Sequence, residues 1–422
     1  MKFLYFITAG LLLTGTARAQ QLLTLEQCRQ MATERNNNLK AAQQKIEAAK
    51  ARKAQAYAGG KPTVDVSATG FYFGKPLNSL LPEYGISPGV SVSQSIYAGG
   101  KVKLNKQLGD NGVQTEEEQK VYTTAEVLFN TEKAYWQVVQ AGEKIRLARQ
   151  YSKQLDALFT DLNNQYVAGI TYKNDVLRVK VQQNDNELNL LKAKDALLLA
   201  KLNLAQVTGM SDTTGFAVSD SITGSFAQQL ADTVQQGKAA NRAEIRILQH
   251  NLTAAKIQES MLKADTRPSI NLGLNGVSAF GKQGINPTSN ANFMASWYSM
   301  LSVNIPVFDW NKRKQKVKEQ QYTVAAQQFQ LKEQEELISL EVRQANLQLN
   351  ESARRVELSG ASLEQAEENL RLSADRLKAG TIIGKDVLEA QTLWQQAYSD
   401  MIDAKVAYKI SEATLRKALG NM

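Results

Sequence analysis

The sequence contains the same structural pattern twice, and the second copy follows the first at a constant offset. Gly380 stands 211 positions after Gly169, and the neighbouring motifs keep this offset: Tyr166-Val-Ala-Gly169 with Asp175-Val-Leu177 returns as Leu377-Lys-Ala-Gly380 with Asp386-Val-Leu388, and Leu204–Gly209 returns as Leu415–Gly420. A unit of this length is far longer than the roughly 20 to 50 residues of a solenoid repeat. The sequence therefore predicts one fold built from two copies of a motif, residues 20–209 and 241–422, joined by a linker over 210–240.

The first nineteen residues are typical of a cleaved signal peptide. Lys2 precedes an apolar run from Phe3 to Leu13, and Ala17-Arg18-Ala19 forms a small-Xaa-small cleavage site. No cysteine follows this site to accept a lipid, so we expect an exported, unlipidated chain that begins near Gln20. Cys28 is the single cysteine of the sequence, so there are no intrachain disulfides and stability must come from packing.

Charge and hydropathy exclude two classes of protein. The formal net charge of +9 falls to +7 without Lys2 and Arg18, and the remaining Lys and Arg residues alternate with Glu and Asp along the chain. This distribution does not indicate a nucleic-acid partner. No stretch after residue 19 approaches the roughly 18 to 20 apolar residues of a membrane helix, so a chain of this kind can enter a membrane only with strands.

Four segments alternate apolar and polar residues, which predicts strands of about nine to eleven residues. They are Thr63–Phe73, Gly89–Tyr97, Ser269–Val277 and a segment that Trp297 and Tyr298 begin and Leu301, Val303, Ile305 and Val307 continue. Residues 74–87 and 281–292 read as the loops within each strand pair. The remaining segments predict helices over 24–58, 101–168, 172–208, 241–264, 311–378 and 384–419, the first of them capped by Thr24 and Glu26.

Heptad spacing is the strongest periodic signal in the predicted helices. One seam of the helix over 311–378 is apolar at Val342, Leu349, Val356, Leu363, Leu370 and Leu377, and an earlier seam runs through Val317, Val324, Leu331, Ile338 and Ala345. The last helix carries an apolar seam at Val387, Trp394, Met401, Tyr408 and Leu415 and a small-residue seam at Ala390, Ala397, Ala404, Ser411 and Ala418. Two seams on one helix predict coiled-coil neighbours on both sides, as in the wall of a tube.

Four strands are too few to close a barrel. An open sheet edge in lipid leaves backbone groups unpaired at several kcal/mol each, and the smallest membrane barrels have about eight strands, so several copies of the chain must share one barrel. A barrel of eight strands is filled by its own side chains, whereas a larger barrel leaves a lumen. A channel therefore favours three copies and twelve strands.

The chain resembles the TolC-like outer membrane efflux protein family over essentially its whole mature length. The resemblance rests on the turn motifs Gly169–Leu177 and Gly380–Leu388 and on the strand-to-helix junctions Ile96–Lys101 and Pro306–Arg313. It implies a mostly α protein with a small β part, a homotrimer whose helical barrel crosses the periplasm and continues into a shared twelve-stranded barrel in outer-membrane lipid. The implied partners are a periplasmic adaptor at the helical tips and an inner-membrane transporter, and the implied function is an exit channel for efflux or type I secretion.

The same resemblance places the gate and the adaptor-docking site at the two turns. Gly169 and Gly380 are read as turn residues, with Thr171 and Thr381 beside them.

Two alternatives exist for the acids that follow these turns. Asp175 and Asp386 either complement a helix dipole, for about 0.3 to 1 kcal/mol, or take part in gating. In the gating hypothesis Asp386 and Glu389 form acidic rings, and Arg178, at the position of Glu389 in the first repeat, is a candidate partner. Ile382 occupies the place of a gate arginine common in the family, so a salt-bridge latch at that position is not expected.

The other motifs do not indicate an enzyme, a metal site or a cofactor. His250 is the only histidine and is read as a surface residue, and Gly99-Gly100-Lys101 lacks the rest of a phosphate loop. Trp297 and Tyr298, and likewise Tyr72 and Phe73, are candidates for anchoring at a membrane interface.

The main alternative to a channel is a pore-free periplasmic coiled-coil scaffold or adaptor. Such a protein needs a compact soluble β domain, for which residues 62–97 lack a two-sided core. The sequence does not indicate the cargo.

Overall fold

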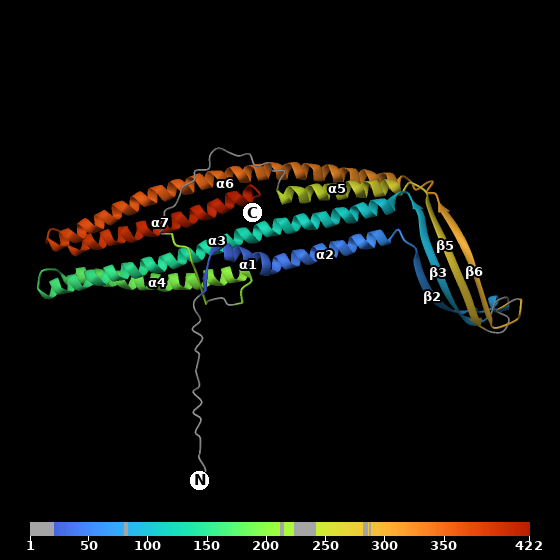
Figure 1. The fold of residues 1–422 in the computed structure, drawn as a ribbon, viewed down its shortest axis with the longest axis horizontal. Helices are drawn as coiled ribbons and strands as arrows, with labels where there is room; N and C mark the ends of the chain where they lie inside the picture. The colour runs from blue at the N-terminus through green and yellow to red at the C-terminus, as the bar shows by residue number, and fades with distance from the viewer. Residues whose placement is uncertain (1–20, 80–82, 212–214, 223–241, 282–285, 287) are drawn as a thin grey trace, which may run out of the picture. The chain divides into compact units, whose positions relative to one another are not determined.

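The computed structural model describes residues 21–79, 83–211, 215–222, 242–281, 286 and 288–422 (Figure 1). The predicted signal peptide and most of the predicted linker lie outside these residues. The chain divides into two compact units, which we describe in turn. The tip unit comprises Met1–Leu39, Thr124–Gln235 and Val342–Met422, and the sheet unit comprises Lys40–Thr123 and Gln236–Glu341. Each unit takes corresponding segments from both sequence repeats.

The sheet unit contains the four predicted strands in one antiparallel sheet. The strands are β2 (Thr63–Tyr72), β3 (Tyr84–Ala98), β5 (Ser269–Gly281) and β6 (Phe293–Asn304), in the order β2-β3-β5-β6. The central pair β3–β5 joins the two repeats, with Gly89 opposite Val277. β2 and β6 are the edges of this sheet, and no described strand pairs with their outer sides.

Pairing extends the strands beyond their alternating segments. β3 begins at Tyr84, so the predicted loop over 74–87 is too long, because Gly85 and Ile86 continue the ladder with β2. β5 runs to Gly281 for the same reason. β6 ends at Asn304, two residues before Pro306, which has no N–H for a ladder. β6 begins at Phe293, so Trp297 lies within the strand and is not its first residue.

The helices of the sheet unit are α2 (Asn37–Ala58), α5 (Ala243–Ala264) and the first parts of α3 (Lys101–Val167) and α6 (Lys312–Lys378). α3 and α6 are 67 residues long, which confirms the predicted long helices and corresponds to about 100 Å each at the rise of an α-helix. Ion pairs tie α3 to α2 and to α5, with Lys53 Nζ 2.8 Å from Asp110 and Arg246 Nε 2.7 Å from Glu118. His250 is half-buried, and its Nδ1 lies 3.1 Å from Asn111 Oδ1, so it has a structural partner on α3.

The tip unit adds α1 (Leu25–Arg35), α4 (Lys173–Thr208) and α7 (Gly384–Ala418) to the later parts of α3 and α6. The prediction of one continuous helix over 24–58 is wrong at one point, because the helix is interrupted at Asn36, between α1 and α2. The Asn36 amide donates to Val207 O at the end of α4 (2.7 Å), and its Oδ1 accepts from the Asn38 N–H (2.8 Å). The Asn36 side chain thus replaces hydrogen bonds that the backbone would make in an unbroken helix.

Thr24 caps α1 as predicted, but Gln27, and not Glu26, completes the capping box. A short parallel pair precedes this helix, β1 (Gln21–Leu23) with β4 (Phe216–Val218), which lies in a stretch predicted to be linker. Leu23 and Phe216 are buried, and the Tyr135 hydroxyl donates to Leu23 O (3.3 Å). Three-residue strands are too short to show any periodicity in a sequence.

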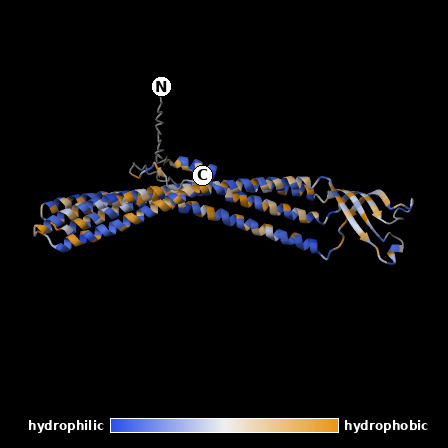
Figure 2. Ribbon diagram, turned by 90° about the horizontal axis from the view of Figure 1, so that it is seen from below, coloured by the Kyte–Doolittle hydropathy of each residue, from blue (hydrophilic) through white to orange (hydrophobic). Residues whose placement is uncertain are grey.

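The heptad seams predicted from Val342 onward and along the last helix contribute to the core of the tip unit. Val342, Leu349 and Val356 of α6 are buried, and both seams of α7 are covered, since Trp394 and Ala404 are 3% and 0% exposed. α7 contacts α6 through one set of residues and α3 through another, as two seams require. No described helix is long and apolar enough to cross a membrane, and Figure 2 shows apolar and polar residues mixed along the helices.

Candidate functional site: the two helical turns

The first turn joins α3 to α4 and reverses the chain at Gly169. Gly169 has φ +75°, and the N–H groups of Gly169 and Ile170 donate to Tyr166 O (3.0 Å) and Gln165 O (2.8 Å). This is a Schellman ending, in which a left-handed residue allows the last carbonyls of a helix to be satisfied. The structure confirms that Gly169 is a turn residue.

The second turn repeats this geometry between α6 and α7 (Figure 1). Gly380 has φ +73°, and the N–H groups of Gly380 and Thr381 donate to Leu377 O and Arg376 O, both at 3.0 Å. The Thr381 hydroxyl adds a bond to Arg376 O (3.1 Å). The two repeats therefore end in two helical hairpins with the same backbone turn.

The acids after the two turns differ in their surroundings. Asp175 is 9% exposed, and one carboxylate oxygen accepts from the Thr171 hydroxyl at 3.0 Å. Asp386 is exposed and accepts from the Ile383 N–H at 3.3 Å. Ile382 stands at the position of Thr171 and has no hydroxyl to offer. One substitution between the repeats thus accompanies the change from an enclosed acid to an acid open to solvent.

Arg178 and Glu389, at equivalent positions of α4 and α7, are both exposed. Among the ion pairs of the described residues, none joins the two. The candidate pairing is therefore not made within one chain.

The two hairpins pack against each other along α3 and α7. Gly384 at the start of α7 lies against Leu162 of α3, where a Cβ on the glycine would be 2.6 Å from the leucine methyls. Further along, the Gln391 amide donates to Gln154 O (3.3 Å), and the hydroxyls of Tyr151 and Thr392 lie 3.3 Å apart. The core beneath the turns contains residues from both hairpins: Leu162, Val176, Val179, Val387 and Trp394.

Large apolar side chains project from the turns into solvent. Val167, Ile170 and Tyr172 of the first turn are 79%, 74% and 81% exposed, and Ile383 of the second is 57% exposed. Apolar side chains that are exposed close together can form a surface for a binding partner. Our sequence reasoning missed these residues, although apolar residues inside a predicted turn were the available signal.

The described residues contain no group of three or more His, Cys, Asp or Glu side chains that could hold a metal ion. The first turn presents mainly apolar side chains to solvent, and the second presents the exposed carboxylates of Asp386 and Glu389.

The family model of the outer membrane efflux proteins matches residues 28–210 and 236–421, one segment for each repeat. Outer membrane protein TolC of Escherichia coli (strain K12) is 23% identical over 441 residues, which cover 100% of this chain and 87% of that protein.

Solved structures share the fold. A membrane protein from Pseudomonas aeruginosa matches with a TM-score of 0.82 at 19% identity, over 94% of this chain and 93% of that one. The Campylobacter jejuni CmeC outer membrane channel matches with a TM-score of 0.80 at 18% identity, over 94% and 85%. The predicted fold class, mostly helical with a small sheet and two repeats, is confirmed. The family is one of channels and not of enzymes. The chain belongs to the outer membrane efflux protein family, whose members are outer-membrane channels with a periplasmic helical domain.

Proposed function

We propose that this protein is the outer-membrane exit channel of a tripartite efflux or type I secretion system. In this role it is a passive conduit that receives cargo from a periplasmic adaptor and an inner-membrane transporter, and it is gated at the two helical turns. The observation that carries the proposal is a four-stranded sheet with two unpaired edges, in a chain of an outer-membrane channel family.

The sheet edges support a homotrimer. Val64 and Val66 of β2 are 65% and 78% exposed, and Trp297 and Leu301 of β6 are 72% and 64% exposed. In lipid the backbone groups of both edges need partners, and a neighbouring copy supplies them when β6 of one chain pairs with β2 of the next. Three copies give twelve strands, enough to enclose a lumen.

An apolar stripe on α4 supports the same assembly. Its members are exposed in the single chain and repeat at multiples of seven residues: Val181, Leu188 and Leu202 on one line, and Leu177, Leu191 and Leu198 on the other. Such a pattern is a coiled-coil seam that has no partner helix within the described chain. A neighbouring copy provides that helix.

The exposed acids of the second turn form the gate in this proposal. Repeated over three copies, Asp386 and Glu389 place six carboxylates around one axis, which favours cations over anions. Asp175 is enclosed by its bond from Thr171 and supports the first turn. The apolar groups Val167, Ile170 and Tyr172, held by the turn at Gly169, form the docking surface for the adaptor, and Gly380, Thr381 and Arg178 belong to the same end.

Planar-bilayer conductance of the detergent-purified mature protein, with its mass by light scattering on the same sample, tests the proposal. We expect a trimer that forms discrete, cation-preferring channels. The double variant D386A/E389A should raise single-channel conductance and weaken block by multivalent cations. The matched control is E364A/E367A, which removes two exposed acids at the same spacing from α6. Unchanged conductance in D386A/E389A would place the constriction elsewhere, and a monomer without conductance would favour the pore-free scaffold.

A further inference from the structure

The junction between β6 and α6 contains two consecutive residues in the left-handed region. Trp310 has φ +53° and Asn311 has φ +63°. The equivalent residues of the first repeat, 211 positions earlier, are Gly99 (φ +63°) and Gly100 (φ +94°). A bulky residue with positive φ is a rare outlier, whereas glycine adopts this region readily. The same backbone bend therefore carries glycine in one repeat and tryptophan in the other.

Close packing explains why the first repeat has a glycine at this bend, but it does not explain the tryptophan of the second repeat. A Cβ at Gly99 would lie 2.6 Å from Ala264 O, and Gly99 O accepts from Arg267 Nη1 at 3.1 Å, so the first junction is closed against its neighbours. Trp310 is 86% exposed and contacts the ring of Phe308, itself 73% exposed, edge to face with centroids 4.9 Å apart. The unfavourable backbone conformation thus displays two aromatic rings to the outside of the chain.

The helix that follows begins with an excess of positive charge. Between Asp309 and Glu319 the sequence has five Lys or Arg residues and no acid. The first turn of α6 contains no acidic residue, and cations near a helix N-terminus oppose the helix dipole, so these charges do not serve the helix. Lys312, Lys314 and Lys316 are exposed, and no carboxylate of the described residues lies within ion-pair distance of them.

Three of these cationic side chains line a cavity beside the junction. Lys312, Arg313 and Lys316 surround a space of about 420 Å³ together with Leu262, Asp265 and Asp309. The two acids already have cationic partners, since Asp309 pairs with Arg313 at 3.2 Å and Asp265 pairs with Lys101. The lysines remain available to an anion from outside the chain.

We propose that Phe308, Trp310, Lys312, Lys314 and Lys316 form a membrane anchor that binds the phosphate headgroups of the periplasmic leaflet of the outer membrane. Aromatic rings of this kind lie at the level of lipid headgroups, and lysines beside a membrane attract anionic lipids. β6 ends at Asn304, only six residues before Trp310, so the surface continues directly from the strand. The inference rests on the membrane location of the family and does not depend on the gate.

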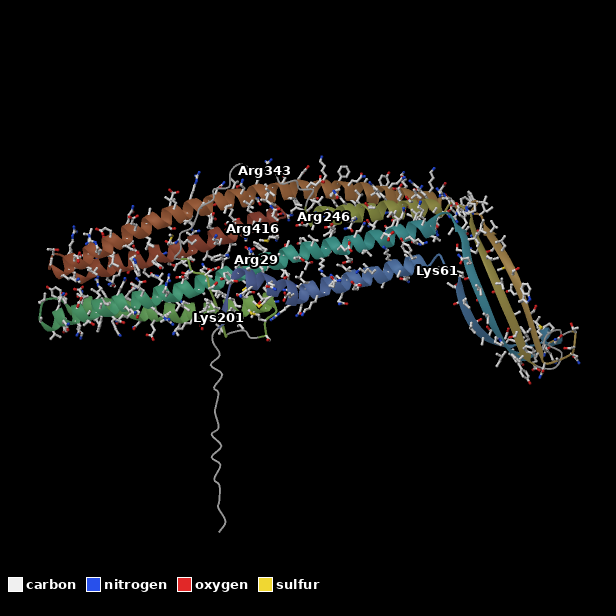
Figure 3. All side chains as sticks on the ribbon, in the orientation of Figure 1. Arg29, Lys61, Lys201, Arg246, Arg343 and Arg416 are labelled. Carbon is white, nitrogen blue, oxygen red and sulfur yellow. The ribbon has the colours of Figure 1, made fainter. Side chains whose placement is uncertain are left out.

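The positive charge of the other strand–helix junctions argues against a second copy of the chain as the molecule that covers this surface. No acid occurs between Glu47 and Asp65, a stretch that contains Lys50, Arg52, Lys53 and Lys61, and Figure 3 shows Lys61 where α2 passes into β2. α3 begins with Lys101, Lys103 and Lys106 and has no acid before Asp110. Lys50, Lys53 and Lys101 have carboxylate partners within the chain. The exposed Lys61 and Lys103 would still bring positive charge from a neighbouring copy to this surface, whereas a phospholipid brings negative charge.

Fluorescence quenching in vesicles tests the proposal. Cys28 is fully buried, so Val307→Cys, at a position that is 90% exposed, offers a single reactive thiol for a fluorophore. The labelled full chain is reconstituted in phosphatidylcholine vesicles that contain a lipid with a nitroxide on its headgroup, with and without phosphatidylglycerol. Phe329→Cys, on an exposed position further along α6, carries the reference label.

We expect at least threefold stronger quenching at Val307 than at Phe329, and a further increase with phosphatidylglycerol. F308S/W310S should reduce the quenching, and K312Q/K314Q/K316Q should abolish the response to phosphatidylglycerol. The control K40Q/K45Q/K332Q removes the same charge from exposed lysines away from the junction and should change neither result.

Equal quenching at Val307 and Phe329 would overturn the proposal, because it would show that the junction does not lie at the level of the headgroups. Mass and conductance measured on the same samples show whether each variant is assembled. Strong headgroup quenching in a protein without conductance would support the anchor while removing the channel proposal, so the two can fail separately.

Discussion

Gly384 and Leu162 meet at a distance that only glycine permits: a Cβ on Gly384 would lie 2.6 Å from both methyl carbons of the leucine. Gly384 begins α7, and Leu162 is fully buried near the end of α3. The first repeat has the exposed Lys173 at the position of Gly384. The close approach of the two hairpins thus depends on one glycine in the second repeat.

Gly384→Ala should destabilise the protein by about 1 to 3 kcal/mol, because the added methyl overpacks the contact with Leu162. Leu162→Ala should cost about 2 to 5 kcal/mol through the cavity it leaves. The double variant should cost less than the sum, since the smaller side chain makes room for the methyl. Denaturant unfolding of the purified variants measures this coupling.

Gly142→Ala is the matched control for this experiment. Gly142 lies inside α3, and nothing is within 4 Å of a Cβ built there. Alanine should therefore stabilise the helix at that position by up to about 1 kcal/mol. Strictly additive effects of G384A and L162A would contradict the proposed contact.

Ser352 and Ser411 share a buried hydrogen bond between α6 and α7, with their hydroxyl oxygens 2.9 Å apart. The Ser352 hydroxyl also lies 2.7 Å from Gln348 O, to which it donates, so Ser411 is the donor in the pair. Ser352→Ala leaves the Ser411 hydroxyl without its acceptor and should cost about 1 kcal/mol or more. Ser411→Ala should cost less, and the double variant should be nearly neutral. Thermal unfolding of the three variants would contradict this assignment if Ser411→Ala proved the more damaging change.

Features that depend on residues close together along the chain were predictable from the sequence, whereas features that depend on contacts between distant residues were not. Heptad seams such as Val342, Leu349 and Val356 can be recognised in a sequence because an apolar residue recurs every seven positions along the helix. The long helices, the four strands and the two turns were therefore predictable, and the structure confirms them. The constant offset also indicated that Gly169 and Gly380 would adopt the same conformation.

The features that the sequence did not predict depend on one side chain acting across the fold. Asn36 breaks a helix because Val207, distant in sequence, offers a carbonyl. β1 pairs with β4 over three residues only, too few for a pattern. At the site, the difference between Asp175 and Asp386 depends on the hydroxyl of Thr171 and on packing around the first turn. Trp310 lies at the position of a glycine in the first repeat, and a tryptophan by itself gives no sequence signal of a left-handed backbone.

Glu132 binds two arginines from different helices, Arg29 of α1 and Arg416 of α7. Figure 3 labels both arginines. The carboxylate is 3% exposed, and Arg29 Nη2 lies 2.5 Å from it. Glu132→Ala should destabilise the tip unit by about 1 to 3 kcal/mol, because it removes the carboxylate between two cations, while Arg29 keeps its pair with Glu26 and both arginines reach solvent. Arg416→Ala should cost less, since Arg29 still pairs with Glu132. The unfolding midpoints of the two variants show which substitution is the more destabilising.

The exposed pair of Lys50 and Glu47 is the control for Glu132. Its side chains are 52% and 50% exposed, so Glu47→Ala should change stability very little, and salt should screen what effect there is. The effect of Glu132→Ala should instead persist at high salt. Similar losses for both variants, both removed by salt, would show that Glu132 acts as an ordinary surface charge.

Alkaline pH should weaken the packing around Cys28 and Tyr135. Burial, with a smaller contribution from Asp220, raises the pKa of the Cys28 thiol from 9.0 to about 12. Burial likewise raises the pKa of Tyr135 from 10.0 to about 12. Between pH 9 and about pH 12 the unfolded chain releases protons that the folded chain keeps, so the free energy of unfolding must fall as the pH rises through this window.

Cys28→Ala removes one of the two groups and should flatten this decline between pH 9 and pH 11, as measured by denaturant unfolding at each pH. Below pH 9 the thiol is protonated in both states, so the variant should show no change in pH dependence there, only the loss of packing by a fully buried side chain. A thiol reagent at pH 8 should react with the wild-type chain only after unfolding. Rapid labelling of the native protein, or an alkaline slope identical in Cys28→Ala and wild type, would show that Cys28 is accessible and that the decline originates at other groups.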